Sequence, residues 1–128
     1  MNIPSNLHYA ETHEWIRIEG DLVVIGITDY AQNEFGEVGI IDLPDVGAEF
    51  DAKEPFGIIE NNKAENDVYA PVSGEIVEVN TKLTEGSGLE LINSDPYGEG
   101  WMVKIKMNEK SELDNLLSSE DYTKLISE

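Results

Sequence analysis

Lys63 is the residue of this sequence whose type and position most directly suggest chemistry. It lies in the segment NNKAEND (residues 61–67) and is the only lysine or arginine between Lys53 and Lys82. The strand-like sequences PFGIIE and DVYAPVSG on either side predict that this segment forms a hairpin tip. A solvated lysine at such a tip is protonated at neutral pH, which argues against a Schiff-base or general-base role. Its exposed amine is instead well placed for acylation in the active site of another enzyme. On spacing alone, a solubilising turn lysine is the alternative.

The two histidines, His8 and His13, are the next candidates, because imidazole is a common metal ligand. Two ligands on one strand need an even spacing to share a face, and two on one helix need a spacing of three or four. Their spacing of five fits neither pattern, and the sequence has no cysteine or third histidine to complete a ligand set. We therefore predict no metal site.

Signatures of enzymes are weak as well. The sequence contains neither the GxxxxGK[ST] phosphate loop nor GxGxxG, and Ser73 in the turn-like PVSG has no histidine near it in sequence. The carboxylates are too numerous for any one pair to stand out as an acid–base couple. We predict a protein without a catalytic site of its own.

The charge of the chain restricts its partners. It has 27 Asp and Glu against 8 Lys and Arg, which gives a net charge of −19 over 128 residues. Such a surface repels nucleic acids and anionic membranes and favours basic patches on other proteins. The absence of cysteine means that any redox sulfur must come from a cofactor. The N-terminal segment lacks the features of a signal or transit peptide, so we expect a cytoplasmic protein, with a mature mitochondrial form as the alternative.

Short strands separated by turn residues are expected to position Lys63. The patterns predict a mainly β fold in one domain, residues 1–128, with a short internal helix at 28–36 and a C-terminal helical segment at about 110–127. The predicted strands are Trp15–Ile18, Leu22–Thr28, Gly39–Leu43, Pro55–Glu60, Asp67–Tyr69, Glu75–Val79 and Trp101–Met107.

Two finer patterns can be tested against the structure. Val77 and Val79 alternate with Glu78, which predicts that the two valines share a buried face. In the tail, Leu113, Leu116 and Leu117 have the spacing of one helical face, and Ser119 is expected to cap a further helical turn or two.

Four segments of the sequence closely resemble the H-protein family of the glycine cleavage system. They are HEWIRIEGD, IGITDYAQ, FGIIENNKAENDVYAPVSGEIVEVN and DPYGEGWMVKIKM, and the similarity runs from about Tyr9 to Tyr122. The resemblance implies a lipoyl/biotinyl-type hybrid barrel-sandwich whose tight hairpin carries a modified lysine. In that family, lipoic acid is attached by an amide bond to the lysine that aligns with Lys63.

The resemblance also implies a non-catalytic carrier role. The family's lipoyl arm takes an aminomethyl group from the glycine decarboxylase (P protein) to the aminomethyltransferase (T protein). Its dithiol is then reoxidised by dihydrolipoamide dehydrogenase (L protein). A lipoyl-attaching enzyme is the further expected partner. A biotin carrier has the same fold class, but its lysine is typically flanked by methionines, whereas Asn62 and Ala64 flank Lys63.

Four further site residues follow from the alignment with this family. Glu14 and Asp67 are expected to receive the ammonium of the loaded arm in a surface cleft, with Glu14 as the chief contact. The alternative for Glu14 is an ordinary exposed acid at a strand edge. Glu60 and Gly74 are expected to help the attaching enzyme recognise the hairpin, although Gly74 also fits a purely structural role in a turn.

The hairpin tip departs from the usual family pattern. The family commonly has Ser-Val before the lysine and a pair of small residues after Lys-Ala, whereas this chain has Asn61-Asn62 and Glu65-Asn66. These changes leave open a second function, an H-like lipoyl carrier that serves lipoate relay or another lipoate-dependent pathway.

Overall fold

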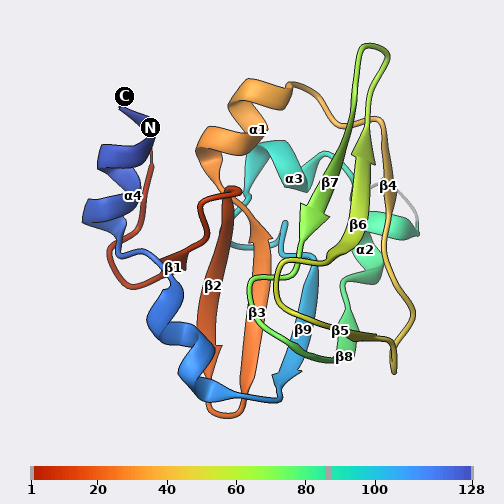
Figure 1. Ribbon diagram of the computed structural model, residues 1–128. Helices are drawn as coiled ribbons and strands as arrows, with labels where there is room; N and C mark the ends of the chain where they lie inside the picture. Colours follow the sequence, from red (N-terminus) through yellow and green to blue (C-terminus); the bar gives the residue numbers. More distant parts are fainter. Residues whose placement is uncertain (1, 86–87, 128) are drawn as a thin grey trace.

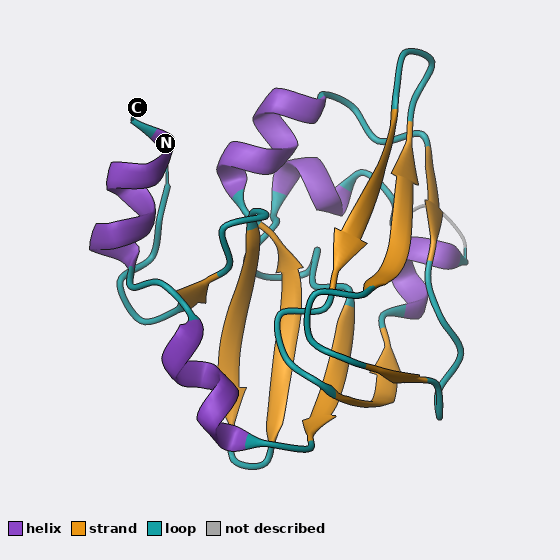
Figure 2. Cartoon of the chain, in the orientation of Figure 1, coloured by secondary structure: helices purple, strands orange, loops and turns teal. Residues whose placement is uncertain are grey.

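A computed structural model describes residues 2–85 and 88–127, and it consists mainly of antiparallel strands (Figures 1 and 2). The strands are β1 (His8–Tyr9), β2 (Glu14–Glu19), β3 (Leu22–Ile27), β4 (Ile40–Asp42), β5 (Glu49–Phe50), β6 (Pro55–Glu60), β7 (Glu65–Tyr69), β8 (Gly74–Val79) and β9 (Val103–Met107). The helices are α1 (Asp29–Phe35), α2 (Thr81–Thr84), α3 (Leu91–Ser94), the 3₁₀ helix η1 (Lys110–Asn115) and α4 (Ser119–Ile126). The predicted mainly β class with a short internal helix is confirmed.

Two antiparallel sheets enclose the main core. The larger sheet has the order β1-β2-β3-β9-β8-β5, and the smaller has the order β4-β6-β7. Buried aliphatic side chains from both sheets meet between them, for example Ile25 and Ile105 from the larger and Ile59 from the smaller. Burial of this apolar surface is the main contribution to stability, at roughly 25 cal/mol per Å².

The β2–β3 hairpin shows why the larger sheet needs glycine in its interior. Trp15 on β2 pairs with Gly26 on β3, and the indole ring lies across the glycine. A Cβ at Gly26 would lie 2.7 Å from Trp15 Nε1, so the buried indole occupies the space of the missing side chain. The same Nε1–H donates to the Pro96 carbonyl over 2.9 Å, which ties this hairpin to the loop before β9.

Helix α1 forms where the sequence predicts it. The Thr28 hydroxyl accepts a hydrogen bond from the Ala31 N–H and so caps the first turn. The helix ends at Gly36, whose φ of +90° is strained for residues with a Cβ. Gln32 donates to the Asp29 side chain rather than to its backbone, so the pair stabilises the helix without forming a capping box.

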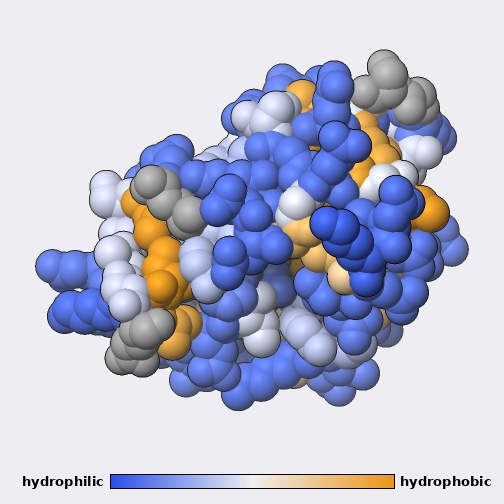
Figure 3. Space-filling view, turned by 90° about the horizontal axis from the view of Figure 1, so that it is seen from above, coloured by the Kyte–Doolittle hydropathy of each residue, from blue (hydrophilic) through white to orange (hydrophobic). Residues whose placement is uncertain are grey.

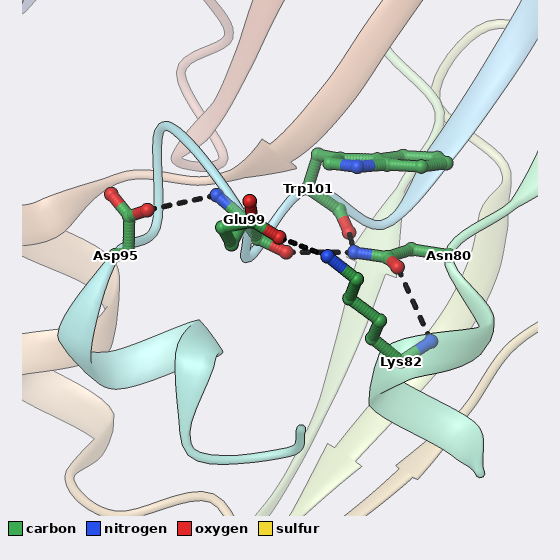
Figure 4. Close-up of polar contacts among 5 residues, drawn as sticks. All are labelled: Asn80, Lys82, Asp95, Glu99 and Trp101. Carbon is green, nitrogen blue, oxygen red and sulfur yellow. Dashed lines mark hydrogen bonds and ion pairs between the residues drawn. The ribbon is translucent and has the colours of Figure 1, made fainter.

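The loop that leads into β9 is held by a polar cluster at the start of α2 (Figure 4). Asn80 caps α2 by accepting from the Lys82 N–H, and its amide donates to the carbonyls of Glu99 and Trp101, both at 2.8 Å. Lys82 pairs with the Glu99 carboxylate. Because Asn80 is buried and bonds to three backbone groups, it fixes the path of the loop that carries Pro96.

The tail departs in part from the predicted helical segment at about 110–127. Residues 110–115 form a 3₁₀ helix, and Leu117 then runs extended beside Tyr9, with N–H···O=C bonds of 2.9 and 2.7 Å between the two backbones. The predicted shared helical face of Leu113, Leu116 and Leu117 is therefore wrong. Leu117 pairs with the free edge of β1 because the backbone N–H and C=O groups of that edge need hydrogen-bond partners. The cap of α4 is Ser118, not Ser119 as expected, since the Ser118 hydroxyl accepts from the Asp121 N–H.

A β-bulge changes the predicted pattern of β8. The register of β8 against β9 shifts between Ile76 and Glu78, so Ile76 is fully buried and Val77 is only half-buried. The expectation that Val77 shares a buried face with Val79 is therefore wrong, because the bulge resets the alternation. The sequence patterns also missed four short elements, β1, β5, α2 and α3.

Within the described residues, none of the helices combines the length and apolar character needed to cross a bilayer. The same part of the chain holds no group of three or more metal-ligating side chains, and His8 and His13 belong to none.

Candidate functional site

Lys63 lies at the tip of the β6–β7 hairpin, which projects beyond the rest of the fold (Figure 1). The last strand pair is Glu60 with Glu65, and residues 61–64 form the connection. The Lys63 side chain is exposed, and its amine pairs with no carboxylate of the described residues. The predicted position of Lys63 at a hairpin tip is confirmed. Viewed from above, the face that includes the hairpin is largely hydrophilic, with apolar surface in separate areas (Figure 3).

Asn61 organises the tip, a role that the sequence analysis missed. Its Oδ1 accepts from the backbone N–H groups of Lys63 and Ala64, both at 2.9 Å. Its own N–H donates to the Ala64 carbonyl at 3.0 Å. This is the turn-forming behaviour for which asparagine is favoured, so the residue type in a predicted turn was the available signal.

Asn61 also fastens the hairpin to helix α1. Its Nδ2 donates to the Phe35 carbonyl at 3.0 Å, which satisfies a backbone acceptor in the last turn of the helix. A second link lies close by, where the Gly39 N–H donates to the Glu60 carbonyl at 2.8 Å. The base of the tip is thus fixed to α1 and to the segment before β4, while the Lys63 amine makes no hydrogen bond or ion pair within the described structure.

Glu60 faces another acid across the end of the hairpin. The two carboxyl groups, Glu60 and Glu65, interact through hydrogen bonding first and charge repulsion second, and this interaction raises the pKa of Glu65. A hydrogen bond between two carboxyl groups needs one proton, which explains the direction. Whether an attaching enzyme reads Glu60 stays a prediction.

A cleft lies beside the hairpin, between α1, the turn before β2, and strand β7. This hairpin cleft has a volume of about 370 Å³. Its apolar lining includes the side chains of Ile27, Phe35 and Ile59. Its polar lining comes from Thr12, His13, Glu14, Tyr30, Glu34, Asn66 and Asp67. Ala64, the neighbour of Lys63, lies at its border. The cleft therefore combines apolar and acidic surface next to the exposed lysine.

Glu14 is the one acidic or basic side chain that is buried among the described residues. It is 2% exposed, so the alternative that it is an ordinary exposed strand-edge acid is wrong. The Thr12 hydroxyl donates to its Oε1, and the Tyr69 N–H donates to its Oε2 at 3.2 Å. Burial raises the pKa of Glu14 to about 7, and these two hydrogen bonds oppose the shift. A cation that binds beside a buried carboxyl group lowers its pKa and so favours the ionised form.

Asp67 lines the same cleft from β7, but its side chain is exposed. The structure thus brings Glu14 and Asp67, which are distant in sequence, to one cavity beside Lys63. One carboxyl group is buried and the other is solvated.

Gly74 does not join this group. It is buried in β8 of the larger sheet, where it pairs with Phe50 and Met107. A Cβ at this position would lie 2.2 Å from the Lys106 carbonyl and 2.5 Å from the side chain of Ile105. Close packing of neighbouring backbone therefore explains the glycine, and its suggested part in recognition by an attaching enzyme stays a prediction.

Comparisons with known proteins agree with this geometry. The profile of the glycine cleavage H-protein family matches residues 7–128. A protein named glycine cleavage system H protein from Carboxydothermus hydrogenoformans is 49% identical over 126 residues, which cover 98% of this chain and 95% of that protein. Another of the same name, from Halothermothrix orenii, is 48% identical and covers 100% of this chain and 98% of its own.

A solved structure extends the likeness to the fold. The crystal structure of a glycine cleavage system H protein from Mycobacterium marinum superposes with a TM-score of 0.88 at 36% identity. The alignment covers 98% of this chain and 100% of the other. The two proteins therefore share the fold over nearly the whole chain. On sequence and structure together, the chain belongs to the glycine cleavage H-protein family.

Proposed function

We propose that this protein is the lipoyl-bearing carrier of the glycine cleavage system, with lipoic acid attached to Lys63 through an amide bond. The observation that carries the proposal is the exposed amine of Lys63, which pairs with no carboxylate of the described residues and lies at the tip of a hairpin anchored by Asn61. An attaching enzyme needs a lysine that can enter its own active site, and a projecting tip meets that need. When bound, the lipoyl group supplies a disulfide–dithiol pair that carries a one-carbon fragment and two electrons.

The residues of the hairpin cleft fit such a group. Ile27, Phe35 and Ile59 offer apolar surface suited to a hydrocarbon and sulfur chain, and Glu14 and Asp67 offer oxygens suited to a cationic amine. An ammonium beside Glu14 favours its ionised form and so opposes the effect of burial on its pKa. Glu14 would thus hold the cargo by a charge-assisted hydrogen bond in a site that limits access of water.

The proposed partners are the enzymes of that system. They are the glycine decarboxylase (P protein), the aminomethyltransferase (T protein), dihydrolipoamide dehydrogenase (L protein) and a lipoyl-attaching enzyme. The net charge of −19 favours fast encounters with basic surfaces, and such encounters are weakened by salt. A carrier that must leave each partner benefits from speed more than from tight binding. We further propose that the chain acts as one non-catalytic domain in the cytoplasm.

Intact mass spectrometry of protein purified from its native cells tests the attachment, followed by peptide mapping. The expected result is one lipoyl increment, located on Lys63 and absent from the other exposed lysines, such as Lys53 and Lys110. An increment of biotin, or no increment in any growth condition, would overturn the proposal.

A second experiment separates glycine cleavage from lipoate relay. Fully lipoylated, reduced-and-reoxidised protein is incubated with glycine and the glycine decarboxylase, and loading of the aminomethyl group is followed by mass. Loading is expected. Failure of a fully lipoylated sample would favour a carrier that serves another lipoate-dependent pathway.

A further inference from the structure

His13 occupies a backbone position that favours glycine. Its φ is +79°, in the left-handed region. It closes the turn between β1 and β2, where its N–H donates to the Ala10 carbonyl at 3.0 Å and the Ala10 N–H donates to the Glu14 carbonyl at 2.9 Å. Glycine or asparagine is usual at such positions because a Cβ is disfavoured there. An imidazole in this place suggests that the ring itself contributes to the structure around it.

The ring of His13 bonds to the C-terminal helix. Its Nδ1 lies 2.8 Å from the hydroxyl oxygen of Tyr122, which is fully buried in α4. The Tyr122 ring stacks on Tyr9, with 4.8 Å between the ring centroids. The same hydroxyl oxygen lies 2.7 Å from Thr28 Oγ1, so it joins the turn before β2 to the residue that caps α1.

The direction of these hydrogen bonds follows from counting protons. Thr28 Oγ1 accepts from the Ala31 N–H, and its own hydrogen is fully buried. Within the described residues, the Tyr122 hydroxyl oxygen is the partner available to accept the hydrogen of the Thr28 hydroxyl. Tyr122 then has one hydrogen left, and it donates this hydrogen to His13 Nδ1. The imidazole is therefore neutral and carries its proton on Nε2. Burial lowers the pKa of His13 against the opposing charge of Glu34, which agrees with a neutral ring.

His13 is placed between two residues that act in the hairpin cleft. Thr12 and Glu14 both line the cleft, and the Thr12 hydroxyl donates to the Glu14 carboxylate. The His13 carbonyl is fixed as well, since it accepts from the Thr28 N–H at 3.0 Å. Hydrogen bonds thus fix both the backbone and the ring of His13. Because Thr12 and Glu14 are its neighbours in the turn, these bonds also determine the orientation of their side chains.

We propose that Tyr122 and His13 are positioning residues for the carrier arm: through this hydrogen bond, the C-terminal helix α4 holds the turn that orients Glu14 in the hairpin cleft. The helix is distant from Lys63 in sequence and supplies no group to the cleft lining that is described above, so its part is indirect. The inference rests on the proposed function in that it takes the lipoyl arm as the ligand of Glu14.

The first test uses unlipoylated protein and nuclear magnetic resonance. Nitrogen-15 shifts report the tautomer of His13, and carbon-13 shifts of labelled glutamate follow the titration of Glu14. In the wild type we expect the Nε2–H tautomer. Tyr122→Phe keeps the stack on Tyr9 but removes the hydroxyl. It should abolish the tautomer preference and lower the titration midpoint of Glu14 by about one pH unit or more, because the loosened turn admits water.

Two matched variants decide whether the ring and the hydroxyl matter in themselves. His13→Asn retains a residue that tolerates the left-handed backbone but removes the imidazole, and it should shift Glu14 as Tyr122→Phe does. Tyr97→Phe is the control, since the Tyr97 hydroxyl also makes two hydrogen bonds, to the Asn2 carbonyl and from the Asp29 N–H, without contacting His13. It should leave the Glu14 titration unchanged.

The second test uses the lipoylated, loaded protein and measures loss of the carried aminomethyl group to water. Tyr122→Phe and His13→Asn should accelerate this loss about three- to tenfold, the size expected for one buried hydrogen bond, whereas Tyr97→Phe should not. If Tyr122→Phe and Tyr97→Phe give the same Glu14 titration, or if His13→Asn titrates like the wild type, the inference is wrong. Because the first test needs no lipoyl group, it can fail or succeed independently of the proposed function.

Discussion

The tip of the hairpin and the floor of the adjacent cleft are built in opposite ways. At the tip, one half-buried side chain, Asn61, orders the turn, and Lys63 extends into solvent. At the floor, Glu14 is buried and receives two hydrogen bonds, and the turn that carries it is held by His13 and Tyr122. The Lys63 amine therefore has no hydrogen-bond or ion-pair partner within the described structure, whereas the carboxyl group of Glu14 is held by two hydrogen bonds.

This difference separates the residues that matter for function from those that matter for stability. Substitution of an exposed tip residue removes little buried area and few hydrogen bonds, so it changes chemistry at a small cost in folding free energy. Substitution on the floor or in the sheets changes buried groups, so both properties respond. The following predictions test that separation.

The largest functional effect is expected for Lys63→Arg. The variant keeps the charge but cannot accept an amide-linked arm, so lipoylation and all carrier activity should be lost. The free energy of unfolding should change by less than about 0.5 kcal/mol, as at exposed sites in general. Lipoyl mass and urea denaturation provide the two measurements. Lys110→Arg, at another exposed lysine, is the control and should keep both properties. Retained carrier activity in Lys63→Arg would contradict the assignment.

Gly74→Ala should have the largest effect on stability. The added Cβ meets the Lys106 carbonyl at 2.2 Å, and relief requires β8 and β9 to move apart. We expect a loss of about 3 kcal/mol or more of folding free energy, at the upper end for overpacked sites. Urea denaturation measures it. Gly20→Ala is a useful contrast: no atom crowds its Cβ, and only its φ of +66° is unfavourable. An equal loss in both variants would show that close packing is not the cause.

Glu14→Gln should remove a pH dependence of stability. The pKa of Glu14 is raised from 4.5 to about 7 in the folded protein, so the folded state binds the proton more tightly than the unfolded state. The contribution of this group to stability is therefore fully present below about pH 4.5 and falls as the pH rises through about 7. Between pH 4 and pH 8, the wild type should lose on the order of 3 kcal/mol relative to the variant.

The measurement is urea denaturation of both proteins across this pH range. Asp67→Asn is the matched control, because its carboxyl group lines the same cleft but is exposed, and it should not change the pH profile in this way. If the wild type and Glu14→Gln keep a constant difference in stability from pH 4 to pH 8, Glu14 does not titrate as described.

The smallest effect is expected for Asn61→Ala. The change removes three hydrogen bonds between the Asn61 side chain and the backbone at a half-buried site, which should cost about 1–2 kcal/mol. Faster hydrogen exchange at the amides of Lys63 and Ala64 should localise the loss to the tip. Asn62→Ala is the control, because Asn62 is exposed and makes no side-chain hydrogen bond within the described structure. Equal exchange in the two variants would mean that Asn61 does not hold the tip.

The same contrast explains what could be predicted from the sequence. The tip depends on a local signal, which is a polar turn between two strand patterns. The strand before it, Pro55–Glu60, was therefore predicted with its observed bounds. The cleft floor depends on contacts between distant segments, such as Tyr122 with His13, and no local pattern encodes them. Burial of Glu14 was missed for this reason, since one of its hydrogen-bond partners, Tyr69, is 55 residues away in sequence.

The errors in secondary structure have related causes. Leu117 follows a helical spacing, yet an unpaired strand edge at Tyr9 binds it in extended form. Val77 follows a strand alternation, yet a bulge moves it away from the core. In both cases a tertiary partner overrides the local period, and such a partner is invisible in a single segment.

The two links between the hairpin and its surroundings also determine where the arm pivots. Because the Asn61 side chain and the Glu60 carbonyl are tied to neighbouring backbone, the peptide at the tip cannot swing as a whole. Rotation is left to the bonds of the lysine side chain and of whatever it carries. The radius over which cargo can travel is then a property of covalent bond lengths, the same at every partner that the protein visits.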